Sequence, residues 1–207
     1  VDGRQTAAER EFLASLKAAL QLGAPQTAAF DQEADALVEV ACVVTDSELN
    51  PIDEGIDVVI APPPEALAHM DQVVVDMHTE SGLLPLLPGG LTLRDAQEIL
   101  LAYLRGHLTE PRKAPLAGSS VHVDRAFLGR DMPEVLDLLH YRIIDVSSIK
   151  ELVRRWYPRT FYNSPAKRGG HRALADTLDS IHELRYDRAT VFVPEPGPTS
   201  EEAKAAT

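Results

Sequence analysis

The sequence predicts a single α/β domain in which a mixed central sheet is flanked by helices. Three observations support this prediction. An almost continuous run of Leu, Val and Ala at 36–45 has the pattern of a central strand. After residue 62, short extended stretches alternate with helical ones, as they do in sheets that carry helices on their faces. The chain has 207 residues, 44% of them hydrophobic, which is enough to bury one sizeable core.

Residues 1–26 are predicted to form a helical extension of this domain. The stretch 7–22 repeats apolar side chains at helical spacing, with Thr6 as a candidate N-cap, and Gly23 and Pro25 end the pattern. The domain itself is expected over 27–193. The Pro-, Glu- and Ala-rich tail 194–207 is predicted to be disordered.

Within the main domain, the pattern predicts strands first and then an alternation of strands and helices. The predicted strands lie at 27–33, 36–45, 55–61, 115–118 and 141–146. The predicted helices lie at 93–108, capped by Thr92, around Asp124, at 147–156 and at 171–186. The first three strands are expected to form an antiparallel meander, and the basic, polar loop 162–170 is expected to act as a mobile flap.

Composition narrows the class of protein. The net charge of −12 argues against a general nucleic-acid coat but permits an enzyme that takes a very short nucleic acid into a metal-lined pocket. The single cysteine, Cys42, cannot form an intramolecular disulfide, so a reducing, cytoplasmic location is expected. No run approaches about 18 apolar residues, and no signal pattern is present, so neither a membrane span nor secretion is expected.

Four carboxylates and one histidine are candidates for metal-dependent phosphodiester hydrolysis. This chemistry needs acids that hold two divalent cations and a base that deprotonates the attacking water. Asp31 and Glu33 share one face of a predicted strand, and Asp124 and Asp176 lie on predicted helices. His171 is the candidate general base, because an imidazole titrates near neutral pH. A ligand set made of oxygens favours Mg²⁺ or Mn²⁺ over zinc.

Several segments together resemble oligoribonucleases, the short-RNA branch of the DEDDh 3′-to-5′ exonucleases. The segments that carry the resemblance are 37–46, 77–83, 118–128, 140–152, 155–158 and 171–176. The resemblance covers roughly 27–193. It implies a ribonuclease H-like exonuclease fold, with Asp124 and Asp176 as the third and fourth acids of a two-metal cluster and His171 as the general base.

The resemblance also implies how a substrate binds. Family members form homodimers and grip the 5′ end of a dinucleotide with a cap of polar groups. The matching residues are His78, Ser120, Arg142 and Ser147. Tyr141 matches a Tyr that stacks on a base, and it reaches in with Arg142 from the other subunit. A second stacking aromatic of the family is matched by Val73, so stacking is expected to be weaker on that side.

The first acidic motif departs from the family pattern, and two alignments compete. With the loop after the first strand at full length, Ala24 and Gln26 take the acidic positions, and Phe30 takes the place of a Leu wedge. With a deletion of about seven residues in this loop, Asp31 and Glu33 take the acidic positions, and the Leu wedge is lost. The second alignment is preferred because the first places Gly and Pro inside a central strand, where Pro removes a ladder hydrogen bond.

The leading hypothesis is therefore a homodimeric 3′-to-5′ exoribonuclease that uses two Mg²⁺ or Mn²⁺ ions to cut very short RNA into 5′-mononucleotides. The alternative is a catalytically impaired relative that binds short oligonucleotides or serves as a dimeric scaffold. A third reading is a soluble α/β domain whose acids are all surface charge.

Overall fold

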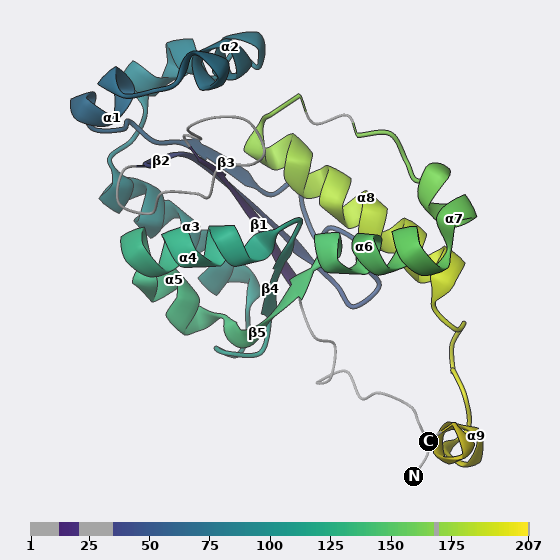
Figure 1. Cartoon of the computed structure of the whole chain (residues 1–207). Helices are drawn as coiled ribbons and strands as arrows, with labels where there is room; N and C mark the ends of the chain where they lie inside the picture. Colours follow the sequence, from purple (N-terminus) through teal and green to yellow (C-terminus); the bar gives the residue numbers. More distant parts are fainter. Residues whose placement is uncertain (1–12, 21–34, 168–169, 207) are drawn as a thin grey trace.

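A five-stranded mixed sheet forms the centre of the molecule (Figure 1). The computed structural model describes residues 13–20, 35–167 and 170–206, and for residues 13–20 the backbone only. The strands are β1 (Leu13–Leu20), β2 (Leu37–Thr45), β3 (Ile56–Val59), β4 (Pro115–Gly118) and β5 (His140–Asp145). Their order is β3-β2-β1-β4-β5. The β3–β2 and β2–β1 pairs are antiparallel, whereas the β1–β4 and β4–β5 pairs are parallel.

Helices cover both faces of this sheet (Figure 1). The helices are α1 (Pro64–Ala68), α2 (Gln72–Glu80), α3 (Leu93–His107), α4 (Val121–Asp131), α5 (Pro133–Leu138), α6 (Val146–Trp156), α7 (Pro158–Tyr162), α8 (Ala173–Val191) and α9 (Ser200–Ala205), with a 3₁₀ helix at Leu84–Gly89. Helix α8 contacts β1 to β4, and α6 packs on α8. Among the described residues, no helix combines the length and the apolar character that crossing a membrane requires.

Strand β2 is buried along its whole length and contributes to three apolar clusters, the two larger of which it separates. Val40, Cys42 and Val44 pack into a cluster with apolar side chains of α3 and α4. Val43 points the other way, into a cluster with α8. Because side chains alternate across a strand, this division follows from the sequence of β2, and it explains why its apolar run is nearly continuous. Glu39 is the one charged residue in this run, and it is fully buried.

The predicted helix at 7–22 is wrong where the structure describes it, because residues 13–20 form strand β1. This strand lies between β2 and β4, with Leu16 opposite Cys42 and Ala14 opposite Leu116. Its Leu-, Ala- and Lys-rich sequence has helical propensity, but a place between two hydrogen-bonding partners overrides a preference of this size. The strand predicted at 27–33 lies outside the described residues.

The predicted disorder of the tail 194–207 is also wrong for the described part, since residues 200–205 form α9. Thr199 and Glu202 build a reciprocal capping box at its start. The Thr199 hydroxyl accepts from the backbone N–H of Glu202 at 3.2 Å, and the Glu202 carboxylate accepts from the backbone N–H of Thr199 at 2.8 Å. Two local hydrogen bonds followed by helix-forming residues suffice for one short helix, which composition alone does not reveal.

The remaining predicted strands and the helices predicted around them are confirmed, with small shifts at their ends. The cap predicted for α3 is present, because Thr92 Oγ1 accepts from the backbone N–H of Asp95 at 3.1 Å. Helix α8 runs to Val191, beyond the predicted end at 186.

A chain that lacks residues 1–20 is expected not to fold, because β2 and β4 both lose the strand that they pair with. Circular dichroism and urea unfolding measure this. The control lacks residues 194–207; since the described residues of α9 are all exposed, this chain is expected to unfold cooperatively, like the full protein. A cooperative transition in the chain without residues 1–20 would contradict the place of β1 in the sheet.

Candidate active site

Helix α8 begins at a buried carboxylate supplied by β2. Glu39 Oε2 accepts from the backbone N–H of Ala173 at 2.7 Å, and Glu39 Oε1 accepts from Arg172 Nε at 2.7 Å. Arg172 precedes the helix and has no side-chain cap of its own, so Glu39 caps the helix from another element. The capped end of the helix presents two candidate residues: His171 immediately before Arg172, and Asp176 in the first turn.

The Arg172 guanidinium joins this carboxylate to a second one. Its Nη2 lies 2.6 Å from Glu39 Oε1 and 3.4 Å from Asp57 Oδ2. The hydrogen bond to Glu39 raises the pKa of Arg172. Burial, reinforced by the charge of Glu39, raises the pKa of Asp57 to about 6. The two acids therefore share one cation at the edge of the site.

Two serines tie the residue before the N-cap of α4 to the second turn of α8. Ser119 and Ser180 share a hydrogen bond of 2.9 Å between their hydroxyls, and Ser180 Oγ also donates to the carbonyl of Asp176 at 2.9 Å. Asp124 lies in the first turn of α4, with an exposed fraction of 1%, and Asp176 lies in the first turn of α8. The two predicted acids thus come from the first turns of two helices that the serines link.

The structure does not place the other two predicted acids, because Asp31 and Glu33 lie outside the described residues, as do Ala24 and Gln26. Neither alignment of the first motif matches the strand between β2 and β4, since that strand is Leu13–Leu20 and its sequence contains no Asp or Glu. In the described part of the chain, no three His, Cys, Asp or Glu side chains stand close enough together to hold a metal ion.

His78 is a buried histidine in the last turn of α2. Its exposed fraction is 1%, and neither of its ring nitrogens has a hydrogen-bond partner among the described residues. Burial lowers its pKa, the charge of Glu39 opposes this shift, and that of His171 adds to it. His78 therefore lies close enough to both groups to sense their charges, and its ring can accept a ligand.

Two more predicted residues meet at the starts of α4 and α6. Ser120 Oγ and Ser147 Oγ lie 3.2 Å apart. Ser120 adopts the left-handed conformation, with φ at 55°, and its hydroxyl does not cap α4. Backbone in this region is uncommon for a residue other than glycine and indicates a conformation held by its surroundings.

The predicted Tyr–Arg pair lies on β5, the strand at one edge of the sheet. Tyr141 is 69% exposed, and the Arg142 guanidinium lies 5.4 Å from the centre of its ring. On the same strand, the centre of the His140 ring lies 4.5 Å from the centre of the Tyr141 ring. Both predicted side chains point away from the protein core, where another molecule can reach them.

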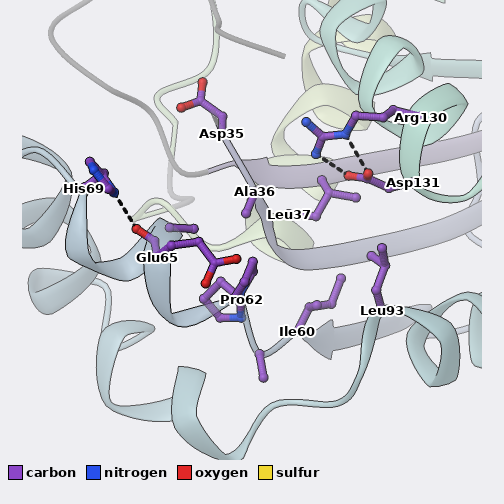
Figure 2. Close-up of a pocket in the computed structure, with 13 residues that line it drawn as sticks. Asp35, Ala36, Leu37, Ile60, Pro62, Glu65, His69, Leu93, Arg130 and Asp131 are labelled. Atoms are coloured by element: carbon purple, nitrogen blue, oxygen red, sulfur yellow. Dashed lines mark hydrogen bonds and ion pairs between the residues drawn. The ribbon is translucent and has the colours of Figure 1, made fainter. Parts of the chain in front are cut away.

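A cavity of about 760 Å³ lies elsewhere in the molecule (Figure 2). It is lined by the start of β2, the residues after β3, helix α1 and the end of α4, where Arg130 and Asp131 pair. Figure 2 shows that pair opposite His69, whose ring bonds to the carbonyl of Glu65. Asp124 occupies the opposite end of α4, so this cavity is separate from the predicted site.

Sequence reasoning missed two acids that organise the site. The sequence pattern predicts Glu39 only as part of a strand and Asp145 only as a residue near the end of one. Asp145 Oδ1 accepts from the backbone N–H groups of Ser120 and Ser147, each at 3.0 Å. The available signal was a carboxylate inside an apolar run, which has to find a partner when it is buried.

These features define a class of protein. The RNase T family of exonucleases matches residues 27–184, so the mixed sheet and the acids in the first turns of two of its helices belong to an exonuclease. Curated relatives narrow the class. The oligoribonuclease of Streptomyces griseus is 65% identical over 82% of this chain and 85% of its own length. That of Cutibacterium acnes is 54% identical over 79% and 81%. The chain belongs to the oligoribonuclease family and is a 3′-to-5′ exoribonuclease.

Solved structures of exonuclease I share the fold. The enzyme from Methylocaldum szegediense has a TM-score of 0.58 at 18% identity, covering 87% of this chain and 41% of its own. The zinc-bound E. coli enzyme with single-stranded DNA has a TM-score of 0.62 at 12% identity, covering 88% and 41%. The chain spans about two fifths of these proteins, so they confirm the predicted ribonuclease H-like fold alone. The catalytically impaired alternative finds no support in these comparisons.

Between about pH 4 and pH 6, the unfolding free energy of the protein is expected to fall with rising pH relative to that of Asp57→Asn. The pKa of Asp57 is raised from 3.8 to about 6, so in this window the native state holds a proton that the unfolded chain has released. This contribution to stability is complete below the lower value and is lost as the pH rises through the higher one. Urea unfolding at several pH values measures the difference; curves that stay parallel would contradict the raised pKa.

Proposed function

We propose that this exoribonuclease acts on very short single-stranded RNA, dinucleotides above all, and releases 5′-mononucleotides as a homodimer in the cytoplasm. The observation that carries the substrate class is the paired hydroxyls of Ser120 and Ser147, 3.2 Å apart where two helices begin. Helix N-termini favour anions, and two hydroxyls with a buried histidine suit a terminal phosphate. A site closed by a phosphate leaves room for few nucleotides beyond it.

The phosphate cap in this proposal consists of Ser120, Ser147, His78 and Arg142. The buried ring of His78 supports it, because its two nitrogens have no partner among the described residues and a substrate phosphate can supply one. An Arg fork binds a phosphate in a bidentate manner, and the exposed Tyr141 ring can stack on a base without reading its identity. Val73, 57% exposed on α2, offers only an aliphatic surface to the other base.

The described acids fit a divalent cation in kind. Asp124 and Asp176 offer carboxylate oxygens, the donors that Mg²⁺ and Mn²⁺ prefer. We assign the rest of the ligand set to Asp31 and Glu33, the acidic pair before β2, on the strength of their spacing. When bound, two such ions would stabilise the charge on the phosphate and lower the pKa of the attacking water.

In this scheme His171 accepts a proton from the attacking water on an imidazole nitrogen. Water oxygen bonds to phosphorus as the bond from phosphorus to the 3′ oxygen breaks, and the released nucleotide carries the phosphate on its 5′ oxygen. His171 is exposed and has φ at 61°, directly before the end of α8 that Glu39 caps. The cap of α8 therefore sets where the base stands relative to Asp176.

Exposed apolar side chains on α6 support the proposal of a homodimer. Trp156 is 66% exposed and Leu152 is 44% exposed, one helical turn apart. Tyr157 follows at 47%. Large exposed aromatics of this kind are enriched in protein interfaces. Tyr141 and Arg142 are exposed on the edge strand β5, and the family resemblance implies that they reach the site of a second copy.

Purified protein with Mn²⁺ is expected to convert a 5′-phosphorylated diribonucleotide into mononucleotides. Asp124→Asn and His171→Ala are each expected to lower kcat by at least about 100-fold, because they remove a metal ligand and the general base. Chromatography of the products measures the rates. Glu201→Gln, an exposed acid on α9, serves as the control and is expected to retain full activity. Full activity in both site variants would overturn the assignment.

The assignment of the first acidic motif has its own test. Asp31→Asn and Glu33→Gln are expected to raise the Mn²⁺ concentration needed for half-maximal activity and to lower kcat about as much as Asp124→Asn does. Folding is checked by urea unfolding of each variant. If both variants keep wild-type kcat and Mn²⁺ dependence, these two residues are not metal ligands.

Trp156→Glu is expected to shift the protein from dimer to monomer, as measured by light scattering after size-exclusion chromatography, because it places a charge in an apolar interface. Val193→Glu, equally exposed near the C-terminal end, is the control.

A mixing experiment then tests whether Arg142 acts across the dimer. Arg142→Ala and Ser120→Ala chains are each expected to be weakly active alone. When the two are mixed and pair at random, about a quarter of all sites are expected to combine an intact Ser120 with an intact Arg142, and activity returns in that proportion. No recovery would place Arg142 in the site of its own subunit.

A further inference from the structure

We propose that Asp145 is a positioning residue that sets the phosphate specificity of this enzyme. This inference rests on the proposed phosphate cap. Asp145 is the last residue of β5 and the N-cap of α6, and it pairs in parallel register with Gly118, just before Ser120. Its place in the sheet brings one carboxylate between the starts of two helices.

A single oxygen of Asp145 holds the backbone of both cap serines. Asp145 Oδ1 accepts from Ser147 N, which is an ordinary helix cap, and from Ser120 N, which lies 25 residues earlier in the chain. Both distances are 3.0 Å. Two residues whose N–H groups share one acceptor must lie close together, so their hydroxyls meet at 3.2 Å.

The left-handed backbone of Ser120 depends on the same contact. This conformation is uncommon outside glycine, and the Ser120 side chain does not stabilise it by capping α4. The Ser120 N–H donates a hydrogen bond to Asp145 Oδ1, and this bond holds the backbone of Ser120 in place. Without it, the residue can relax to an ordinary conformation, and its hydroxyl then turns away from Ser147.

The second oxygen of Asp145 contacts side chains at the protein surface. Asp145 Oδ2 accepts from Ser148 Oγ at 3.1 Å and faces His122 Nδ1 at 3.8 Å. Ser148 is exposed, so this contact can be removed without touching the cap serines. Removal of the Ser148 hydroxyl therefore tests the Oδ2 contact alone and leaves both backbone N–H groups on Oδ1.

The test compares kcat/KM for a diribonucleotide with a 5′-phosphate and one with a 5′-hydroxyl. Asp145→Thr keeps a cap for α6 but cannot serve both backbone N–H groups, and it is expected to reduce the preference for the 5′-phosphate about 10- to 100-fold. Asp145→Asn keeps an acceptor in the place of Oδ1 and is expected to retain most of the preference. Ser148→Ala, the matched control, is expected to retain all of it.

The readout separates this inference from the proposed function. The preference is a ratio of two substrates measured on one preparation, so a partly unfolded variant does not change it. If the wild-type protein shows no preference, the proposed cap fails. If the wild type prefers the phosphate and Asp145→Thr does so equally, Asp145 has no positioning role. If Asp145→Asn loses the preference as fully as Asp145→Thr, the charge and not the shared acceptor matters, and the inference is overturned.

Discussion

The arrangement of this site depends on one buried carboxylate. Glu39 is the third residue of the apolar strand β2, has no exposed surface, and accepts hydrogen bonds from Arg172 and the first N–H of α8. A charge in such a place is tolerated only when it is fully paired. Because its partners are the residues that begin α8, the need to satisfy Glu39 fixes the end of the helix that carries His171 and Asp176.

A second strand carboxylate, at the β5 edge of the sheet, also accepts hydrogen bonds from helix starts. Asp145 ends β5 as Glu39 interrupts β2, and both acids use backbone N–H groups at helix starts. Asp124, Ser147 and Asp176 consequently lie in the first turns of α4, α6 and α8. Carboxylates on two strands thus hold the backbone N–H groups at the starts of three helices, Glu39 that of α8 and Asp145 those of α4 and α6.

Much of this could be predicted from the sequence. The apolar run of β2, the Thr92 cap and the positions of Asp124 and Ser147 follow from periodicity and turn chemistry. The contact between Glu39 and Ala173 could not, because the partners are 134 residues apart and a single Glu in a strand gives no sign of its partner. The sequence of β1 predicts a helix because its Leu, Ala and Lys residues satisfy helical spacing, but its conformation is set by pairing with two strands elsewhere in the chain.

The central place of β1 has a consequence for how the protein is made. Its antiparallel partner β2 follows soon after it, but its parallel partner β4 lies about 100 residues further along. During synthesis, the antiparallel half of the sheet can therefore assemble well before the parallel half, since distant pairings wait for the chain that closes them. Until then one edge of β1 stays open, and an unpaired edge is where nascent chains associate wrongly. The order of the strands therefore leaves this edge of β1 open until the middle of the chain has been made.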